Sequence, residues 1–326
     1  MDAKNASFLY LSSIGEIQVV RKLIAQGIDV NMRDCDGNTA LHMAAKENRV
    51  EVLNLLLENG AFVNALNENG DSALHVSIQS KAIESIQLLL HNQIDVNCFN
   101  NEKCSALMCA MAIGSRETLT AAEIMLRNKI IELLIRHENI DLRCVTSHAR
   151  KIFEGSNYLF YAIRLGNYFV VKQILEKDPS LLEISDAYGD YPIHRAAINN
   201  RLEILKLILS IDGGFLNARG LHKMTPLYYA VRHQSFDVIA YLLQQKANSN
   251  LATLEGYTSL HSALHEYLVC CSNNANDCKY DAPEIFRPNL VDFKKKCANL
   301  AVAVYLIENC FVQYSRKLNN KSFNFL

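Results

Sequence analysis

The chain has 326 residues, of which 50% are hydrophobic and 21% are charged, and its formal net charge is −1. This composition excludes an intrinsically disordered chain, and the nearly neutral charge gives no global attraction to nucleic acid or anionic lipid. The apolar runs are all shorter than the roughly 20 residues that a membrane-spanning helix needs, so we expect no membrane insertion. The ten cysteines are scattered, which predicts reduced thiols and a cytoplasmic location.

The N-terminal part of the chain predicts pairs of short helices. Residues 5–35 contain two such patterns, and residues 36–68 contain two more. In the second unit, Thr39 can cap the first helix, and valine and leucine make one apolar face of the second helix. Gly60 suits a left-handed C-cap. A unit of this size cannot bury its apolar face alone, so it needs copies of itself as neighbours.

The third and fourth units repeat this pattern over residues 69–101 and 102–144. The fourth unit is longer, because its anchor Leu107 and its later helix residue Leu134 are 27 residues apart (134 − 107). The corresponding residues of the second unit are only 15 apart (56 − 41). We place the extra residues near 114–128 and, because good helix formers fill part of this stretch, we expect them to lengthen or add a helix.

Regular units return after a longer connection over residues 144–156. Thr225-Pro226 places proline at the expected first residue of a helix, which is a good start signal. The last unit is interrupted near residues 268–296, where asparagine and proline predict a loop in at least part of the insertion. The predicted units of this half are 155–187, 188–220, 221–254 and 255–310 with that insertion, followed by a tail over 311–326.

The anchor residues recur at a fixed period. The step from Leu41 to Leu74 is 33 residues (74 − 41), and the step from Leu74 to Leu107 is the same (107 − 74). The turn Thr-Ala-Leu-His at 39–42 returns as Ser-Ala-Leu-His at 72–75 and as Thr-Pro-Leu-Tyr at 225–228. With this period and turn, the chain resembles the ankyrin-repeat family.

The resemblance implies one all-α domain over residues 1–326. It would be a solenoid of about eight helix-turn-helix units with short β-hairpin-like loops and two insertions. It also implies that His42, His75, His194 and His261 hydrogen-bond between neighbouring hairpins instead of binding a ligand.

The implied function is a non-catalytic scaffold that binds a partner protein on its concave face, as a monomer and without a cofactor. The chain is also rich in asparagine and resembles the ankyrin effectors that intracellular bacteria deliver into host cells. That second resemblance implies virulence, secretion into the host cytoplasm and a host protein as partner.

Hairpin tips and the exposed ends of the first helices are the positions free to contact a partner. In the N-terminal half these positions are polar and partly acidic, as in Cys35, Asp36, Lys46, Glu47, Glu68, Asn69, Asp71 and Gln79. In the C-terminal half they are aromatic, aliphatic or basic, namely Arg164, Leu165, Tyr188, Ile198, Leu221, His222, Met224, Arg232, His233, Leu254, Tyr257 and His265. Because aromatic residues and arginine dominate interface hot spots, we predict that the main interface lies in the C-terminal half.

An enzyme or a zinc protein that uses the insertions around 144–156 and 268–297 is the alternative. His261 and His265 are four residues apart, and Cys270, Cys271, Cys278 and Cys297 follow, but the paired C-x-x-C spacing of a convincing zinc site is missing. One of these cysteines with His265, or Cys144 with His148, could act as nucleophile and base. The sequence has no Gly-rich phosphate loop, no G-x-S-x-G and no H-E-x-x-H.

Asn31 and Asn97 are candidate modification sites. Each ends a Leu-x-x-x-x-x-Asp-Val-Asn stretch, which resembles the pattern that a cellular asparaginyl hydroxylase accepts in ankyrin-like repeats. Asn64 and Asn250 lack the acid of this pattern, so we expect them to be poorer substrates. The alternative is that these asparagines only stabilise their hairpins.

Overall fold

The computed structural model describes residues 3–114, 119–144 and 157–264. The chain divides into two compact units, the first made of Met1–Tyr158 and Glu176–Asp178, and the second of Leu159–Leu175 and Pro179–Leu326. Among the described residues, β pairing is limited to two isolated bridges, Leu66 with Ser72 and Phe99 with Ser105. The predicted all-α fold with hairpin-like loops is therefore confirmed.

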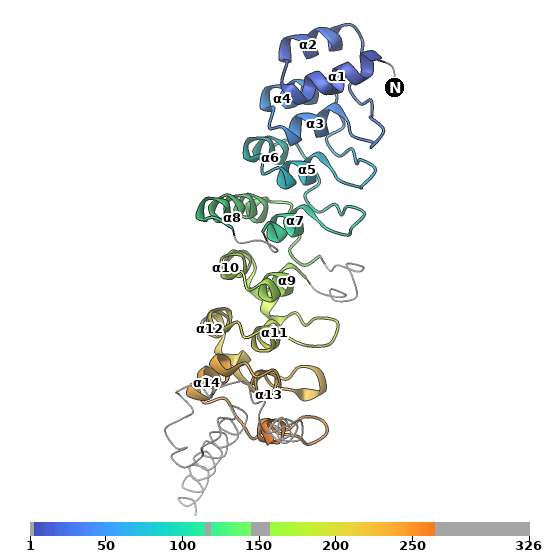
Figure 1. Ribbon diagram of the computed structural model, residues 1–326. Coiled ribbons are helices and arrows are strands. Elements are labelled where there is room, and N and C mark those ends of the chain that lie inside the picture. The colour runs from blue at the N-terminus through green and yellow to red at the C-terminus, as the bar shows by residue number, and fades with distance from the viewer. Residues whose placement is uncertain (1–2, 115–118, 145–156, 265–326) are drawn as a thin grey trace, which may run out of the picture. The chain divides into compact units, whose positions relative to one another are not determined.

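The first unit is a stack of helix pairs (Figure 1). The pairs are α1 (Ala3–Ile14) with α2 (Ile17–Ala25), α3 (Ala40–Lys46) with α4 (Val50–Glu58), α5 (Ala73–Gln79) with α6 (Ile83–Leu90), and α7 (Ala106–Ala112) with α8 (Ala121–Arg136). The first helices α1, α3, α5 and α7 contact one another in this order, and the second helices α2, α4, α6 and α8 do the same. Each pair therefore buries its apolar faces against the pairs before and after it.

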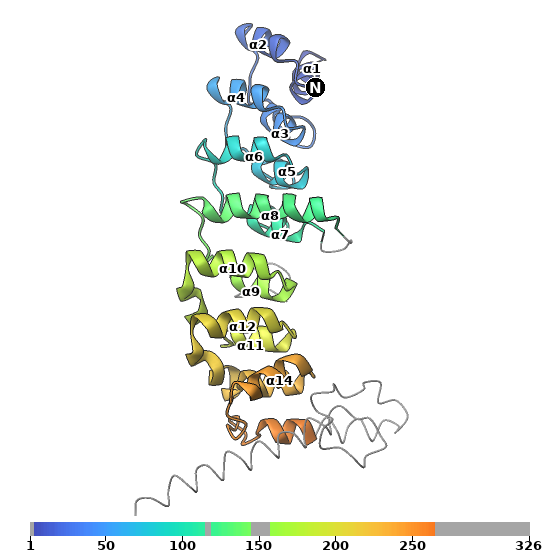
Figure 2. The same cartoon turned by 90° about the vertical axis from the view of Figure 1, so that its left-hand side faces the viewer.

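The second unit is built in the same way (Figures 1 and 2). Its labelled helices among the described residues are α9 (Tyr158–Leu165), whose first residue belongs to the first unit, α10 (Tyr168–Lys177), whose last two residues also do, α11 (Pro192–Ile198), α12 (Leu202–Ile211), α13 (Pro226–Arg232) and α14 (Phe236–Gln244). Three short 3₁₀ helices, η1 (Pro179–Glu183), η2 (Gly213–Asn217) and η3 (Leu221–Lys223), lie between them and were not predicted from the sequence. One reason for η2 is local, because the carboxylate of Asp212 accepts a hydrogen bond from the N–H of Gly214 at 2.7 Å.

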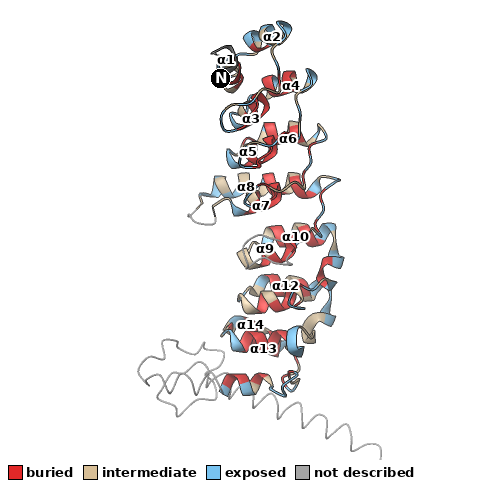
Figure 3. Cartoon of the chain, turned by 90° about the vertical axis from the view of Figure 1, so that its right-hand side faces the viewer, coloured by how far each residue is buried: buried red, intermediate tan, exposed pale blue. Residues whose placement is uncertain are grey.

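Within each unit the buried residues lie on the helix faces that meet (Figure 3). The recurring anchors Leu41, Leu74, Leu107 and Leu227 keep 1% of their surface or less exposed. Burial of each leucine side chain contributes about 1.5–3 kcal/mol, so every anchor stabilises the packing of its own helix pair. The repeat boundaries given above stay predictions.

Histidine side chains join successive hairpins, as the family resemblance implied. The Nε2–H of His42 donates to the carbonyl of Asp71 at 3.0 Å, and that of His75 donates to the carbonyl of Cys104 at 3.1 Å. Because a carbonyl only accepts, the proton is on Nε2, and Nδ1 of His42 accepts from the N–H of Thr39 at 3.2 Å. His194 makes the equivalent bond to the carbonyl of Ala218 at 3.1 Å. These rings are structural.

Each hairpin turns through a left-handed residue four positions before the anchor leucine or isoleucine. Gly37, Gly70, Gly189 and Gly256 occupy this position with φ between 72° and 88°. Among the described residues, Lys103 and Lys223 occupy the same position in two further hairpins, with φ of 60° and 59°. Glycine adopts this conformation without the steric cost that a Cβ brings.

We predict that Gly70→Ala destabilises the protein by about 1 kcal/mol more than Gly189→Ala. Both variants put a Cβ at positive φ, but only at Gly70 would that Cβ lie 2.8 Å from the backbone nitrogen of Asn101. At Gly189 nothing lies within 4 Å. Urea unfolding followed by circular dichroism measures both variants, and equal losses would contradict the close approach.

The fourth helix pair differs from the others in the length of α8. This helix has 16 residues, compared with 9 in α4 and 8 in α6. Thr120 begins it in a capping box, because the carboxylate of Glu123 accepts from the N–H of Thr120 at 3.1 Å. Lys81 holds the same carboxylate at 3.0 Å. The predicted insertions at 145–156 and 268–296 and the tail at 311–326 lie outside the described residues.

Candidate protein-binding surface

The hairpin tips within each unit are joined by hydrogen bonds. In the first unit, the N–H of Glu68 donates to the carbonyl of Asp36, and the N–H of Asn101 donates to that of Asn69, both at 2.9 Å. In the second unit, the N–H of Leu254 donates to the carbonyl of His222 at 2.8 Å. The tips therefore form an ordered row, and the side chains on them have fixed neighbours.

Four apolar side chains project from successive tips of the second unit. The exposed fractions are 53% for Tyr188, 36% for Leu221, 60% for Leu254 and 54% for Tyr257. We call these four residues the tip strip. Leu221 is held to the preceding hairpin, because its N–H donates to the carboxylate of Asp190 at 3.0 Å. The three tips that carry the strip are therefore joined in sequence, the first at Tyr188 and the last at Leu254 and Tyr257.

The other predicted contact residues differ in burial. His222, Arg232 and His233 are exposed, and His222 lies 3.3 Å from the carboxylate of Glu255. The half-buried residues are Arg164, Leu165, Ile198 and Met224. They contribute part of their surface to the packing of the stack, so less of each is open to a partner. His265 lies outside the described residues.

Sequence reasoning missed an ionic network beneath the tip strip. Nε of Arg195 donates to Asp186 at 2.7 Å, and its Nη2 lies 3.4 Å from Asp190. The guanidinium carbon is also 5.4 Å from the ring centre of Tyr188, a cation–π distance. The hydroxyl of Tyr229 donates to Asp190 at 3.0 Å, and burial followed by this carboxylate raises the pKa of Tyr229 well above its ordinary value. The network fixes the ring of Tyr188 from below.

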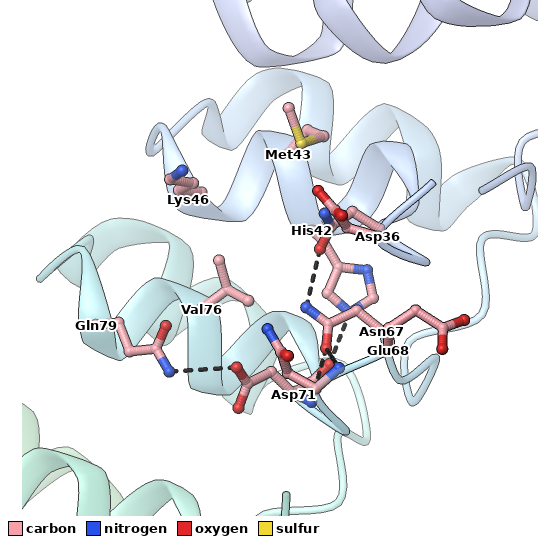
Figure 4. A pocket seen from close by; sticks show the side chains of 11 residues that line it. Asp36, His42, Met43, Lys46, Asn67, Glu68, Asp71, Val76 and Gln79 are labelled. Carbon is pink, nitrogen blue, oxygen red and sulfur yellow. Dashed lines mark hydrogen bonds between the residues drawn. The ribbon is translucent and has the colours of Figure 1, made fainter. Parts of the chain in front are cut away.

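The first unit carries a polar pocket of about 250 Å³ on its hairpin side. Figure 4 shows Met43 and Lys46 on one helix, Val76 and Gln79 on the next, and Asp71 at the hairpin between them. The remaining lining residues are Asp36, Asn38, His42, Asn67, Glu68 and Asn69. Most of the polar positions that the sequence placed in the N-terminal half therefore converge on this pocket.

Asn31 and Asn97 use both amide atoms to join neighbouring hairpins. The Nδ2 of Asn31 donates to the carbonyl of Gly60 at 3.0 Å, and its Oδ1 accepts from the N–H of Phe62 at 2.7 Å. Asn97 makes the same pair of bonds with residues 139 and 141, at 2.7 and 2.9 Å. Both residues therefore have a structural role, and their hydroxylation stays a proposal.

The structure gives no support to the zinc alternative in the parts that it describes. Residues 3–114, 119–144 and 157–264 contain no group of three or more His, Cys, Asp and Glu side chains that could hold a metal ion. His148, His265, Cys270, Cys271, Cys278 and Cys297 lie outside those ranges. Over the same ranges, none of the helices has the length and apolarity needed to cross a membrane.

A family model for ankyrin repeats, in three copies, matches residues 7–100, 119–219 and 193–277. These ranges cover well over half of the chain and include all the labelled helices except α7 and the start of α1. The chain belongs to the ankyrin-repeat family. Ankyrin repeats are protein-interaction modules, so their stack is a scaffold for contacts with other proteins.

Three relatives from mouse and rice share part of this chain. Mouse ankyrin repeat and SAM domain-containing protein 6 is 30% identical over 101 residues, which is 31% of this chain and 11% of that protein. Rice probable E3 ubiquitin-protein ligase XBOS33 is 36% identical over 115 residues, 35% of this chain and 22% of the relative. Mouse palmitoyltransferase ZDHHC13 is 33% identical over 132 residues, 38% of this chain and 20% of the relative. The aligned part is thus 11–22% of the length of each of these relatives. The activities in their names belong to those proteins.

Proposed function

We propose that this ankyrin-repeat protein is a non-catalytic scaffold that binds a partner protein through the tip strip of its second unit. The observation that carries the proposal is the exposure of Tyr188, Leu221, Leu254 and Tyr257 on successive tips, each between 36% and 60%. Large apolar side chains exposed on neighbouring tips are typical of protein-binding sites. Tyrosine in particular contributes much contact area at a low cost in conformational entropy.

The surroundings of the strip favour a protein partner over a small ligand. The exposed basic residues Arg232 and His233 end helix α13, and the pair of His222 and Glu255 lies at the tips beside the strip. An apolar centre with polar and charged neighbours is the usual anatomy of a protein interface. Tyr188 is held in place by Arg195, so little order has to be gained when a partner binds.

We predict that Tyr188→Ala and Tyr257→Ala each weaken partner binding by more than about 1 kcal/mol, at least fivefold in Kd, because each removes an aromatic anchor from the strip. The measurement captures partners on the intact wild-type protein and then compares the affinity of the strongest one for each variant. Tyr168→Ala is the matched control, since Tyr168 is 44% exposed but lies on α10, away from the tips. Wild-type affinity in both strip variants would place the interface elsewhere.

The class of partner protein is inferred from the sequence. We infer a host-cell protein as partner and a monomeric state, on the resemblance to bacterial ankyrin effectors given above. If the protein enters an animal cell, Asn31 and Asn97 are candidate hydroxylation sites, and a mass spectrum of the recovered protein tests this by a 16-dalton addition. Elemental analysis of the intact chain tests the zinc alternative, with a stoichiometric zinc content as the result that would favour it.

A further inference from the structure

The pocket of the first unit has a buried carboxylate at its base. Asp71 keeps 6% of its surface exposed and lines the pocket. Its Oδ1 accepts from Nδ2 of Asn100 at 2.8 Å, and its Oδ2 accepts from Nε2 of Gln79 at 3.3 Å. Both donors are neutral amides. Within the described residues, no lysine or arginine forms an ion pair with Asp71, so this buried negative charge has no internal cation. Burial of a carboxylate is costly without a paired cation.

The second unit shows how the same position is satisfied elsewhere in the chain. Asp190 stands three residues before the anchor Ile193, as Asp71 stands three residues before Leu74. Asp190 is also buried, with 1% of its surface exposed. Here the guanidinium of Arg195 lies between two carboxylates, 2.6 Å from Asp186 and 3.4 Å from Asp190. The second unit therefore contains its own cation at this site.

Val76 replaces that arginine in the first unit. Arg195 stands two residues after its anchor, and Val76 is the residue two positions after Leu74. The valine side chain is short and uncharged, so it cannot form an ion pair with Asp71. The space beside it is the pocket. In Figure 4, Val76 and Gln79 line one side of the pocket and the carboxylate of Asp71 lies at its base.

We propose that the pocket of the first unit binds an arginine side chain of a partner protein. The guanidinium would pair with Asp71, as that of Arg195 pairs with Asp190 at 3.4 Å while it donates to Asp186. Asp36 and Glu68 at the rim add two more negative charges, against the single ammonium of Lys46. Met43 and Val76 supply apolar walls for the methylene stem of the arginine. A planar guanidinium is matched to a carboxylate flanked by amides better than the point charge of lysine is.

The size of the pocket agrees with this occupant. A volume of about 250 Å³ lies below the roughly 300–1,000 Å³ of typical small-molecule sites, but it can hold one long side chain. The proposal does not depend on the tip strip, because every residue that it uses belongs to the first unit. It assigns a second contact point to the scaffold, with a different chemistry from the apolar strip.

The test uses a blocked pentapeptide with arginine between glycines and its citrulline counterpart, which has the same shape without the charge. Amide chemical shifts of the intact, isotope-labelled chain follow each titration. We expect the arginine peptide to shift the amides of Glu68, Asp71 and Gln79, and the citrulline peptide to bind at least tenfold more weakly. Equal shifts from both peptides, or no shift at these amides, would overturn the proposal.

A variant whose own side chain fills the pocket provides a second test. Val76→Arg places an arginine at the register position of Arg195, so it should occupy the pocket and reduce binding of the arginine peptide at least tenfold. Val76→Gln is the matched control, since it adds a long side chain without the charge and should keep most of the binding. Full peptide binding by Val76→Arg would contradict the proposal. Tyr188→Ala should bind the peptide like the wild type, which separates this test from that of the tip strip.

Discussion

Lowering the pH from 7.5 to 5 is expected to reduce the free energy of unfolding, with a loss of up to about 2 kcal/mol for each buried histidine that stays neutral in the fold. Burial is the largest cause that lowers the pKa of His42, His75 and His194 below the ordinary value of 6.5. The unfolded chain therefore binds protons that the folded chain does not. This stability is fully present above about pH 6.5 and is lost as the pH falls below it.

Urea unfolding at pH 7.5, 6.5 and 5.0 measures the loss as a lower midpoint at each step. The midpoint should fall because Nδ1 of His42 and Nδ1 of His75 each accept a hydrogen bond, and a second ring proton would break it. His75→Gln should show a smaller fall between pH 7.5 and 5.0 than the wild type. A midpoint that stays constant or rises on acidification would contradict the assigned neutral state.

Replacing Asp190 by alanine is expected to destabilise the second unit by about 1–3 kcal/mol, the cost of leaving a buried hydrogen-bond donor unsatisfied. The carboxylate accepts from the N–H of Leu221 and from the hydroxyl of Tyr229, and it lies 3.4 Å from the guanidinium of Arg195. Removing it leaves the buried hydroxyl of Tyr229 and the N–H of Leu221 without this acceptor, while Arg195 keeps its bond to Asp186. A buried donor without an acceptor costs its desolvation energy. The loss should appear in the second unit, because all four residues lie there.

Hydrogen exchange under native conditions separates the two units in the Asp190→Ala variant. Amides of α11 and α13 should exchange much faster than in the wild type, while those of α3 and α5 keep their rates. Asp237→Ala is the matched control, because Asp237 is exposed in the first turn of α14 and its loss should change stability by no more than about 0.5 kcal/mol. A loss below about 1 kcal/mol for Asp190→Ala would show that the network contributes little.

The period and the anchors made the fold predictable. Leu41, Leu74 and Leu107 repeat at one spacing, and a spacing kept over several units leaves few ways to bury the same face. The histidine bridges were predictable for the same reason, because His42 and His75 occupy one register position. Glycine indicates the left-handed turn where it is present, but in two hairpins Lys103 and Lys223 stand at this position, and lysine gives no such indication.

The candidate sites were less predictable, because they depend on what lies beside each register position. The sequence indicated apolar tips at Tyr188 and Tyr257, but not that Arg195 holds Tyr188 in place. That contact joins the hairpin at Tyr188 to helix α11. Expecting it from the sequence requires a comparison of the charged residues at the same register position in each repeat. The pocket at Asp71 was missed because a void depends on the size of Val76, and an apolar residue in a helix looks like ordinary packing.

The most direct measurement is hydrogen–deuterium exchange of the intact protein with and without the strongest partner captured by the wild type. The account predicts slower exchange at the hairpin tips of the second unit, residues 186–190, 219–224 and 252–257, with the second helices α10, α12 and α14 unchanged. Protection confined to α10, α12 and α14, or to the first unit, would contradict the claim that the tip strip is the binding surface.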